Sequence, residues 1–141
     1  MSGQSAHTPR VVVITGASAG VGRAAARAFA ARGDAVGLIA RGEAGLEAAS
    51  REILEAGGIA AWAAADVAHA EALEAAAEKM EAALGPIDVW VNNAMVTVLS
   101  PVSEMDSEDY RRVTEVAYLG MVHGTQAALR RMRPRNTGVI I

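Results

Sequence analysis

Apolar residues along the chain fall into short, dense runs separated by segments in which apolar positions recur every three or four residues. The dense runs cover residues 11–14, 35–40, 59–65 and 87–91, and another begins at Gly138. Such runs, without polar alternation, are typical of strands that are covered on both faces in a parallel sheet. We therefore predict about five strands, the fifth of them clipped at the end of the chain.

The segments between the first four runs have the spacing of amphipathic helices. In the first of them Val21, Ala25, Ala28 and Phe29 recur at i, i+4, i+7 and i+8, which places them on one face. Glycines follow each of these three helical segments, as expected where helices end. Strand and helix thus alternate, which predicts an α/β fold with a doubly wound parallel sheet, Rossmann-like, in three α/β/α layers.

A longer helix is predicted after the fourth strand, over residues 107–133. Asp106 and Ser107 can cap its start, and Pro134 ends it. Two glycines inside it, Gly120 and Gly124, each cost on the order of 1 kcal/mol relative to alanine, which suggests close approach of another backbone or helix. Its predicted apolar side carries Tyr110, Val113, Ala117, Met121, Gly124 and Ala128.

A glycine-rich turn joins the first strand to the first helix. It reads Thr15-Gly16-Ala17-Ser18-Ala19-Gly20-Val21-Gly22. Such a turn can bring bare backbone N–H groups and the positive end of a helix dipole against a phosphate. We therefore predict a dinucleotide-binding domain over residues 10–141, incomplete at its C-terminal end, preceded by a flexible leader at residues 1–9.

The spacing Thr-Gly-x-x-x-Gly-x-Gly resembles the short-chain dehydrogenase/reductase family, and the resemblance extends from Arg10 to Ile141. Asp66-Val67 follows the third strand, where the family holds adenine; the alternative is that Asp66 only caps the next helix. Asn92-Asn93-Ala94 resembles the family's Asn-Asn-Ala-Gly, although Met95 replaces the last glycine. The cofactor-binding residues that the resemblance implies are Thr15, Gly16, Ser18, Ala19, Gly20, Val21, Gly22, Arg41, Asp66, Val67, Asn93 and Ala94.

The end of the second strand bears on the choice of cofactor. A site for NAD(H) usually places a carboxylate there to accept the ribose hydroxyls, whereas an arginine can pair with the 2′-phosphate of NADP(H). This chain has Arg41 at that place and no acid before Glu43. The resemblance therefore favours NADP(H) over NAD(H), the alternative being that Arg41 is a solvated residue at the entry to a helix.

No catalytic residue can be identified within the 141 residues. The family's serine and its Tyr-x-x-x-Lys pair are expected beyond Ile141, and the position of its proton-relaying asparagine is Ala117. Tyr110 and Tyr118 do not replace the missing tyrosine, because Thr114 and Val122 stand where the lysine would be.

Composition narrows the class of protein. Without cysteine there are neither disulfides nor thiolate metal sites, and the separated histidines His7, His69 and His123 do not suggest a metal site. Interspersed charges with a net charge of −3 give no basic stripe for nucleic acid. No apolar run approaches the roughly 18 residues of a membrane span, so we expect no membrane partner and a cytoplasmic location.

The resemblance implies the cofactor-binding part of an oxidoreductase that transfers a hydride between NADP(H) and a small alcohol or carbonyl substrate. This chain alone is expected to be inactive. The alternatives are a non-catalytic nucleotide-binding or regulatory protein without the Ser/Tyr/Lys site, and an unstable fragment. A homo-oligomer through the helix at 107–133 is also expected.

Overall fold

A computed structural model describes residues 8–141 of the chain and shows one five-stranded sheet with all neighbouring strands parallel. The predicted leader lies outside the described residues, apart from Thr8 and Pro9. Across the sheet the order is β3-β2-β1-β4-β5. The strands are β1 (Val11–Thr15), β2 (Ala35–Ala40), β3 (Ile59–Ala64), β4 (Ile87–Val91) and β5 (Val139–Ile140).

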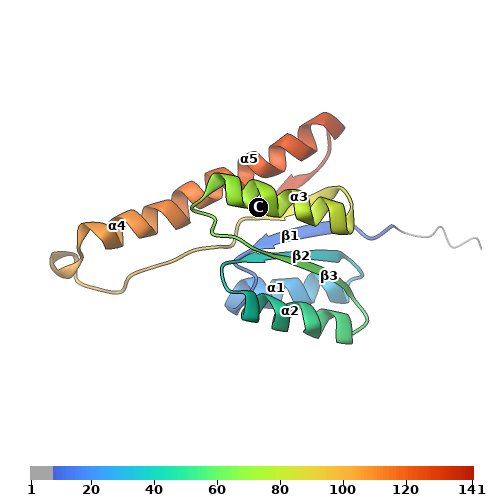
Figure 1. The fold of residues 1–141 in the computed structure, drawn as a ribbon, viewed down its shortest axis with the longest axis horizontal. Coiled ribbons are helices and arrows are strands. Elements are labelled where there is room, and N and C mark those ends of the chain that lie inside the picture. The colour runs from blue at the N-terminus through green and yellow to red at the C-terminus, as the bar shows by residue number, and fades with distance from the viewer. Residues whose placement is uncertain (1–7) are drawn as a thin grey trace, which may run out of the picture.

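Helices cover both faces of this sheet, so the predicted three-layer α/β/α fold is confirmed (Figure 1). α1 and α2 lie on one face, and α3 and α5 on the other. The helical elements are α1 (Gly20–Ala31), α2 (Glu43–Glu55), α3 (Ala70–Leu84), η1 (Val102–Glu104), α4 (Ser107–Val113), η2 (Thr114–Leu119), α5 (Gly120–Met132) and η3 (Arg133–Arg135). No helix within residues 8–141 is long and apolar enough to cross a membrane.

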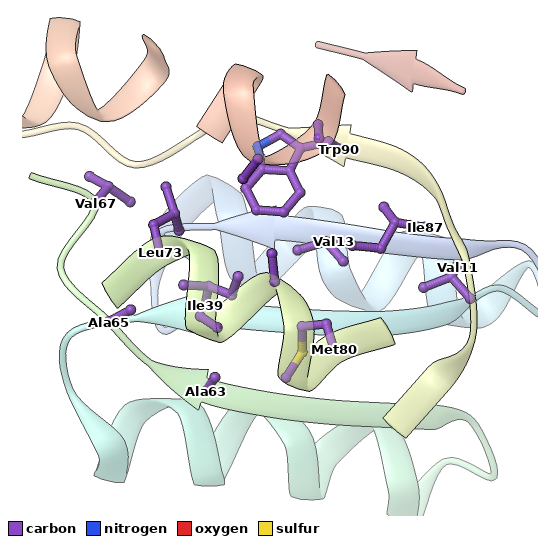
Figure 2. Packing of buried hydrophobic residues seen from close by; sticks show 14 of the residues in the cluster. Val11, Val13, Ile39, Ala63, Ala65, Val67, Leu73, Met80, Ile87 and Trp90 are labelled. Atoms are coloured by element: carbon purple, nitrogen blue, oxygen red, sulfur yellow. The ribbon is translucent and has the colours of Figure 1, made fainter. Parts of the chain in front are cut away.

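The central strand β1 is buried along its whole length, as its unbroken apolar run predicts. Because side chains alternate along a strand, Val11 and Val13 join the cluster beneath α3 and α5, whereas Val12 and Ile14 join the cluster beneath α1 and α2. Figure 2 shows the first of these clusters, where Trp90 from β4 packs with residues of the sheet and of α3. Trp90 is fully buried.

The strand order places a crevice at the carboxyl end of β1. After β1 the chain builds β2 and β3 on one side, then returns to build β4 and β5 on the other. The connections that leave β1 and β4 therefore diverge from neighbouring strand ends. In open α/β sheets, ligands bind at this type of switch point.

The helix predicted over residues 107–133 is not uniform. A π-helical segment, η2, lies between α4 and α5. The predicted apolar side is therefore only partly correct: Gly124 and Ala128 are buried, but Tyr110 and Met121 are exposed. Because a π turn has i→i+5 hydrogen bonds, it shifts the phase of the helix, and Val116 and Gly120 face the interior instead.

Both glycines of this helix lie where another group comes close, but the groups are side chains of other segments and not the backbone or helix that was predicted. A Cβ on Gly120 would be 2.5 Å from Cγ2 of Val67. A Cβ on Gly124 would overlap the side-chain oxygen of Asn92 and lie 2.8 Å from Nε1 of Trp90. Trp90 Nε1 donates a hydrogen bond to Asn92 Oδ1 at 2.9 Å, so the missing side chain leaves room for a buried polar contact.

Candidate functional site: a cleft at the carboxyl end of the sheet

Thr15 joins the glycine-rich turn to the loop that follows β4. Its hydroxyl oxygen accepts hydrogen bonds from the backbone N–H groups of Asn93 and Ala94, both at 3.1 Å. In return the Asn93 side chain donates to the carbonyl oxygens of Thr15, at 3.0 Å, and Gly16, at 3.3 Å. These bonds fix the two connections that diverge from β1 and β4 against each other.

Two glycines allow the turn and this loop to come so close. Gly16 has a φ of +70°, and a Cβ there would lie 2.8 Å from Cα of Ala94. A Cβ on Gly22 would overlap the carbonyl oxygen of Gly16 and lie 2.5 Å from Nδ2 of Asn93. Since backbone atoms cannot give way as a flexible side chain can, these two positions require glycine.

The turn leads into the N-terminus of α1 without a side-chain cap. Ala19 is the N-cap residue and makes no capping hydrogen bond. Gly20, with a φ of +55°, has open space where its Cβ would be. The first N–H groups of a helix lack partners within the helix and carry its positive partial charge. This terminus can therefore accept an anion.

A cleft of about 880 Å³ opens beside this helix terminus. That volume is within the range of sites for small molecules and cofactors. All of the predicted cofactor residues line it except Thr15 and Gly22, which are buried. The lining consists of Gly16, Ser18, Ala19, Gly20, Val21, Ala40, Arg41, Gly42, Ala65, Asp66, Val67, Asn93, Ala94, Met95, Val96, Arg112 and Val116.

Arg41 is exposed at one end of the cleft, directly after β2. Within residues 8–141 no acidic side chain forms an ion pair with it. The first turn of α2 packs close by, because a Cβ on Gly45 would lie 3.0 Å from Cβ of Ser18. Arg41 and the glycine-rich turn thus line the same cleft.

Asp66 lies on the wall built by the loop after β3. One carboxylate oxygen accepts from the backbone N–H of Ala68 at 3.0 Å, and the other is 2.9 Å from Nη2 of Arg112. Burial acts to raise the pKa of Asp66, but the Ala68 hydrogen bond and the Arg112 guanidinium outweigh it and lower that pKa. The N-cap of α3 is His69, so Asp66 is not the helix cap considered as the alternative.

The sequence interpretation missed Arg112. In the sequence, α3, β4 and the long loop that contains η1 lie between Asp66 and Arg112. An arginine on a helix ordinarily indicates a solvated face. The structure makes it a lining residue of the cleft.

Val67, the neighbour of Asp66, is held from α5. Its carbonyl oxygen lies 2.8 Å from Nδ1 of His123. Because a carbonyl can only accept, Nδ1 carries the proton in this contact. Gly120 meets the Val67 side chain from the same helix, so both the side chain and the carbonyl of Val67 are fixed by α5.

Met95 lines the cleft where the resembling motif has glycine. Its side chain is 72% exposed, and its φ is not positive, so the loop accommodates a side chain without strain. Ala117 lies in η2 and is absent from the cleft lining. The Thr114 hydroxyl donates to the carbonyl oxygen of Tyr110 at 2.8 Å, within its own helix, and Tyr118 is 64% exposed.

Comparison with known proteins agrees with this geometry. The family model described as short chain dehydrogenase matches residues 10–141. 3beta-hydroxysteroid dehydrogenase 1 of Eggerthella lenta is 38% identical over 134 residues, which are 94% of this chain and 51% of that protein. The chain spans about half the length of this curated relative, and from about a fifth to somewhat over half of other curated relatives that it matches.

Solved structures with both nicotinamide cofactors are similar to this chain. An actinorhodin polyketide ketoreductase (F189W) with NADPH has a TM-score of 0.89 and 34% identity, covering 94% of this chain and 51% of that one. NAD⁺-bound xylitol dehydrogenase also has a TM-score of 0.89, with 30% identity, covering 95% and 52%. With the family model matching from Arg10 to the last residue, this chain belongs to the short-chain dehydrogenase family.

Proposed function

We propose that the cleft binds NADP(H), with its pyrophosphate at the N-terminus of α1 and its 2′-phosphate at Arg41. The observation that carries the proposal is the Arg41 guanidinium on the lining of the cleft, which has no acidic partner among residues 8–141. A carboxylate at this position would repel the 2′-phosphate, whereas a guanidinium can form two parallel hydrogen bonds with it. The uncapped start of α1 supplies the second anion-binding element.

Each predicted cofactor residue has a role in this proposal. Ser18, Ala19, Gly20 and Val21 offer the turn and the helix N-terminus to the pyrophosphate. Asp66 and Val67 lie where the adenine ring would bind, and Ala94 lies on the opposite wall. Thr15, Gly16, Gly22 and Asn93 hold the walls in place. Bound NADPH would supply a hydride.

Titration of the purified chain with NADPH and NADH, followed by cofactor fluorescence, tests the proposal. We expect NADPH to bind more tightly than NADH. Arg41→Ala should lower the affinity for NADPH by about tenfold, with little change in the affinity for NADH, because a charge-assisted pair is lost. Arg51→Ala is the matched control, since Arg51 is an exposed residue of α2 outside the cleft. Equal loss in both variants, or no preference for NADPH, would contradict the proposal.

We further propose that the cofactor domain serves an oxidoreductase that acts on an alcohol or carbonyl substrate, with the serine, tyrosine and lysine supplied by sequence that follows residue 141. The similarity to dehydrogenases over the whole matched region supports this proposal. Reading the coding frame past codon 141 tests it. A Ser followed by Tyr-x-x-x-Lys is expected, and their absence would favour the second candidate.

That second candidate is a nucleotide-binding or regulatory protein without catalysis. Met95 in place of glycine and Ala117 in place of asparagine favour it, since the family's glycine belongs to a motif that lines the cofactor cleft and its asparagine helps relay protons. Tight NADPH binding by the complete gene product, with no turnover of any alcohol or ketone in a broad panel, would support it. Turnover would exclude it.

The exposed apolar face of α5 and η2 supports a proposal of self-association. Tyr118, Leu119, Met121 and Leu129 are all more than a third exposed on this segment. A helix face of this kind is expected to pair with a second copy of the chain. Light scattering should then report a dimer, and Met121→Glu should shift it to monomer while Val102→Glu, on η1, should not. A monomeric starting protein would contradict the proposal.

A further inference from the structure

Arg112 and Asp66 form an ion pair on the lining of the cleft, between residues 46 positions apart in the sequence. The Nη2–Oδ2 distance is 2.9 Å, and both side chains are mostly buried, 31% and 21% exposed. The other Asp66 oxygen accepts the N–H of Ala68. A carboxylate has about four acceptor sites, so two of them remain available after these contacts are made.

The two fixed contacts determine the orientation of the carboxylate plane. A carboxylate held by one hydrogen bond can still rotate about its χ2 angle, which is broad for aspartate. A second partner on the second oxygen removes that freedom. Asp66 lines the cleft, so its carboxylate is within reach of a ligand that binds there.

The helix that carries Arg112 is itself anchored to the same loop. Gly120 packs against Val67, and His123 donates to the Val67 carbonyl oxygen. Val116, which lies in η2 between Arg112 and Gly120, is buried and lines the cleft. Contacts from η2 and α5, C-terminal to Arg112, therefore hold this helical segment against the loop, and the ion pair with Asp66 holds the guanidinium itself.

We propose that Arg112 is a positioning residue that aims the Asp66 carboxylate at the 6-amino group of the adenine ring. This inference rests on the proposed function, in that it requires an adenine nucleotide in the cleft. Arg112 contacts Asp66 and not the base. Its contribution is to the recognition of adenine as opposed to a purine that lacks the amino donor.

Arg111 provides a matched control on the same helix. It is the next residue, has the same side chain, and lies 3.6 Å from Glu108 on the solvent side, where it is 65% exposed. It does not line the cleft. Replacing either arginine by glutamine changes the net charge of the chain equally, so long-range electrostatic effects on an anionic ligand should be similar for the two variants.

The experiment measures affinities for NADPH and for its hypoxanthine analogue, in which oxygen replaces the 6-amino group. The unmodified chain should prefer NADPH by about tenfold, as expected for one hydrogen bond to a charged acceptor. Arg112→Gln should remove most of that preference, chiefly by weakening NADPH. Arg111→Gln should keep it, and Arg112→Lys should restore part of it. Thermal unfolding checks that each variant is folded.

A double-mutant cycle separates positioning from a general structural effect. In an Asp66→Ala background, Arg112→Gln should leave the ratio of the two affinities unchanged, because the group it orients is gone. If the unmodified chain binds neither nucleotide, the proposed function fails and this inference with it. If it binds NADPH preferentially and Arg112→Gln retains the preference, or tightens binding, only the inference is overturned.

Discussion

The two walls of the cleft are built in different ways. The wall at β1 and β4 is made of backbone, with Gly16 and Gly22 touching the loop at Asn93 and with Thr15 bonded to that loop. The wall at β2 and β3 is made of charged side chains, Arg41 and the pair Asp66–Arg112. In the first wall Thr15 and Gly22 are buried and the loop at Asn93 is half-buried, whereas Arg41 in the second wall is exposed.

This difference separates stability from ligand choice. A change in the backbone wall moves atoms that have no room to move, so it should cost folding free energy. A change in the charged wall removes groups that water already solvates in part, so it should alter the ligand more than the fold. Four substitutions test this separation on the common scale of unfolding free energy.

Gly22→Ala should have the largest effect. Its Cβ would meet the Gly16 carbonyl oxygen and lie 2.5 Å from Nδ2 of Asn93. Overpacking against backbone should lower the free energy of unfolding by about 3 kcal/mol. Urea denaturation measures this loss. Gly42→Ala is the control, because a Cβ there would meet nothing within 4 Å, and an equal loss in both variants would contradict the special role of the backbone wall.

Thr15→Val should come next. Valine keeps the shape but removes the oxygen that accepts from the N–H groups of Asn93 and Ala94, in a residue that is only 2% exposed. The Ala94 N–H then has no partner, whereas the Asn93 N–H keeps the Val91 carbonyl oxygen at 3.1 Å, so the loss should be about 2 kcal/mol in urea denaturation. Thr114→Val removes an exposed hydroxyl bonded to Tyr110 and should cost much less. Similar losses would show that burial of these donors is incomplete.

Arg112→Gln should cost only about 0.5 kcal/mol at neutral pH, because solvent partly screens its pair with Asp66. The pKa of Asp66 is lowered in the fold, so the stability that this carboxylate contributes is present above its ordinary pKa and is lost as pH falls through the lowered pKa. The difference in free energy of unfolding between the original chain and the variant should therefore decrease as the pH falls. Unfolding measured across acidic pH tests this, and a gap that widens would contradict it.

Arg41→Ala should have the smallest effect on stability, within about 0.5 kcal/mol, because Arg41 is exposed. Within residues 8–141 it has no acidic partner to lose. The midpoint of urea denaturation should not move. A clear destabilisation would mean that Arg41 contributes to the stability of the fold, and it would contradict the proposed difference between the two walls.

The fold was predictable because its signals are local. The run at residues 11–14 and the glycines that follow it specify a buried strand and a tight turn without reference to the rest of the chain. The order of strands and helices then limits the topology to a right-handed, doubly wound sheet. Most of the cleft lining follows from this, since the predicted residues all lie at the carboxyl ends of parallel strands.

The charged wall was less predictable because its contacts are between distant segments. Nothing near Arg112 in the sequence indicates Asp66 as its partner, and nothing near Val67 indicates Gly120 or His123. The face of the long helix was misassigned for a related reason. Reading Tyr110 and Met121 as buried assumes one uniform period, and a single π turn is invisible in a pattern of apolar residues.

That π turn has a consequence for how the chain tolerates insertions and deletions. Successive residues of an α-helix are rotated by about 100° about its axis. Inserting or deleting one residue between Val113 and Gly120 would therefore rotate the side chains of α4 relative to those of α5. α4 contacts Asp66 through Arg112, whereas α5 contacts Val67 and packs on the sheet. α4 extends beyond the sheet in Figure 1. Through its i→i+5 hydrogen bonds, η2 sets the rotation of α4 relative to α5, so that Arg112 and Gly120 both face the loop at Asp66 and Val67.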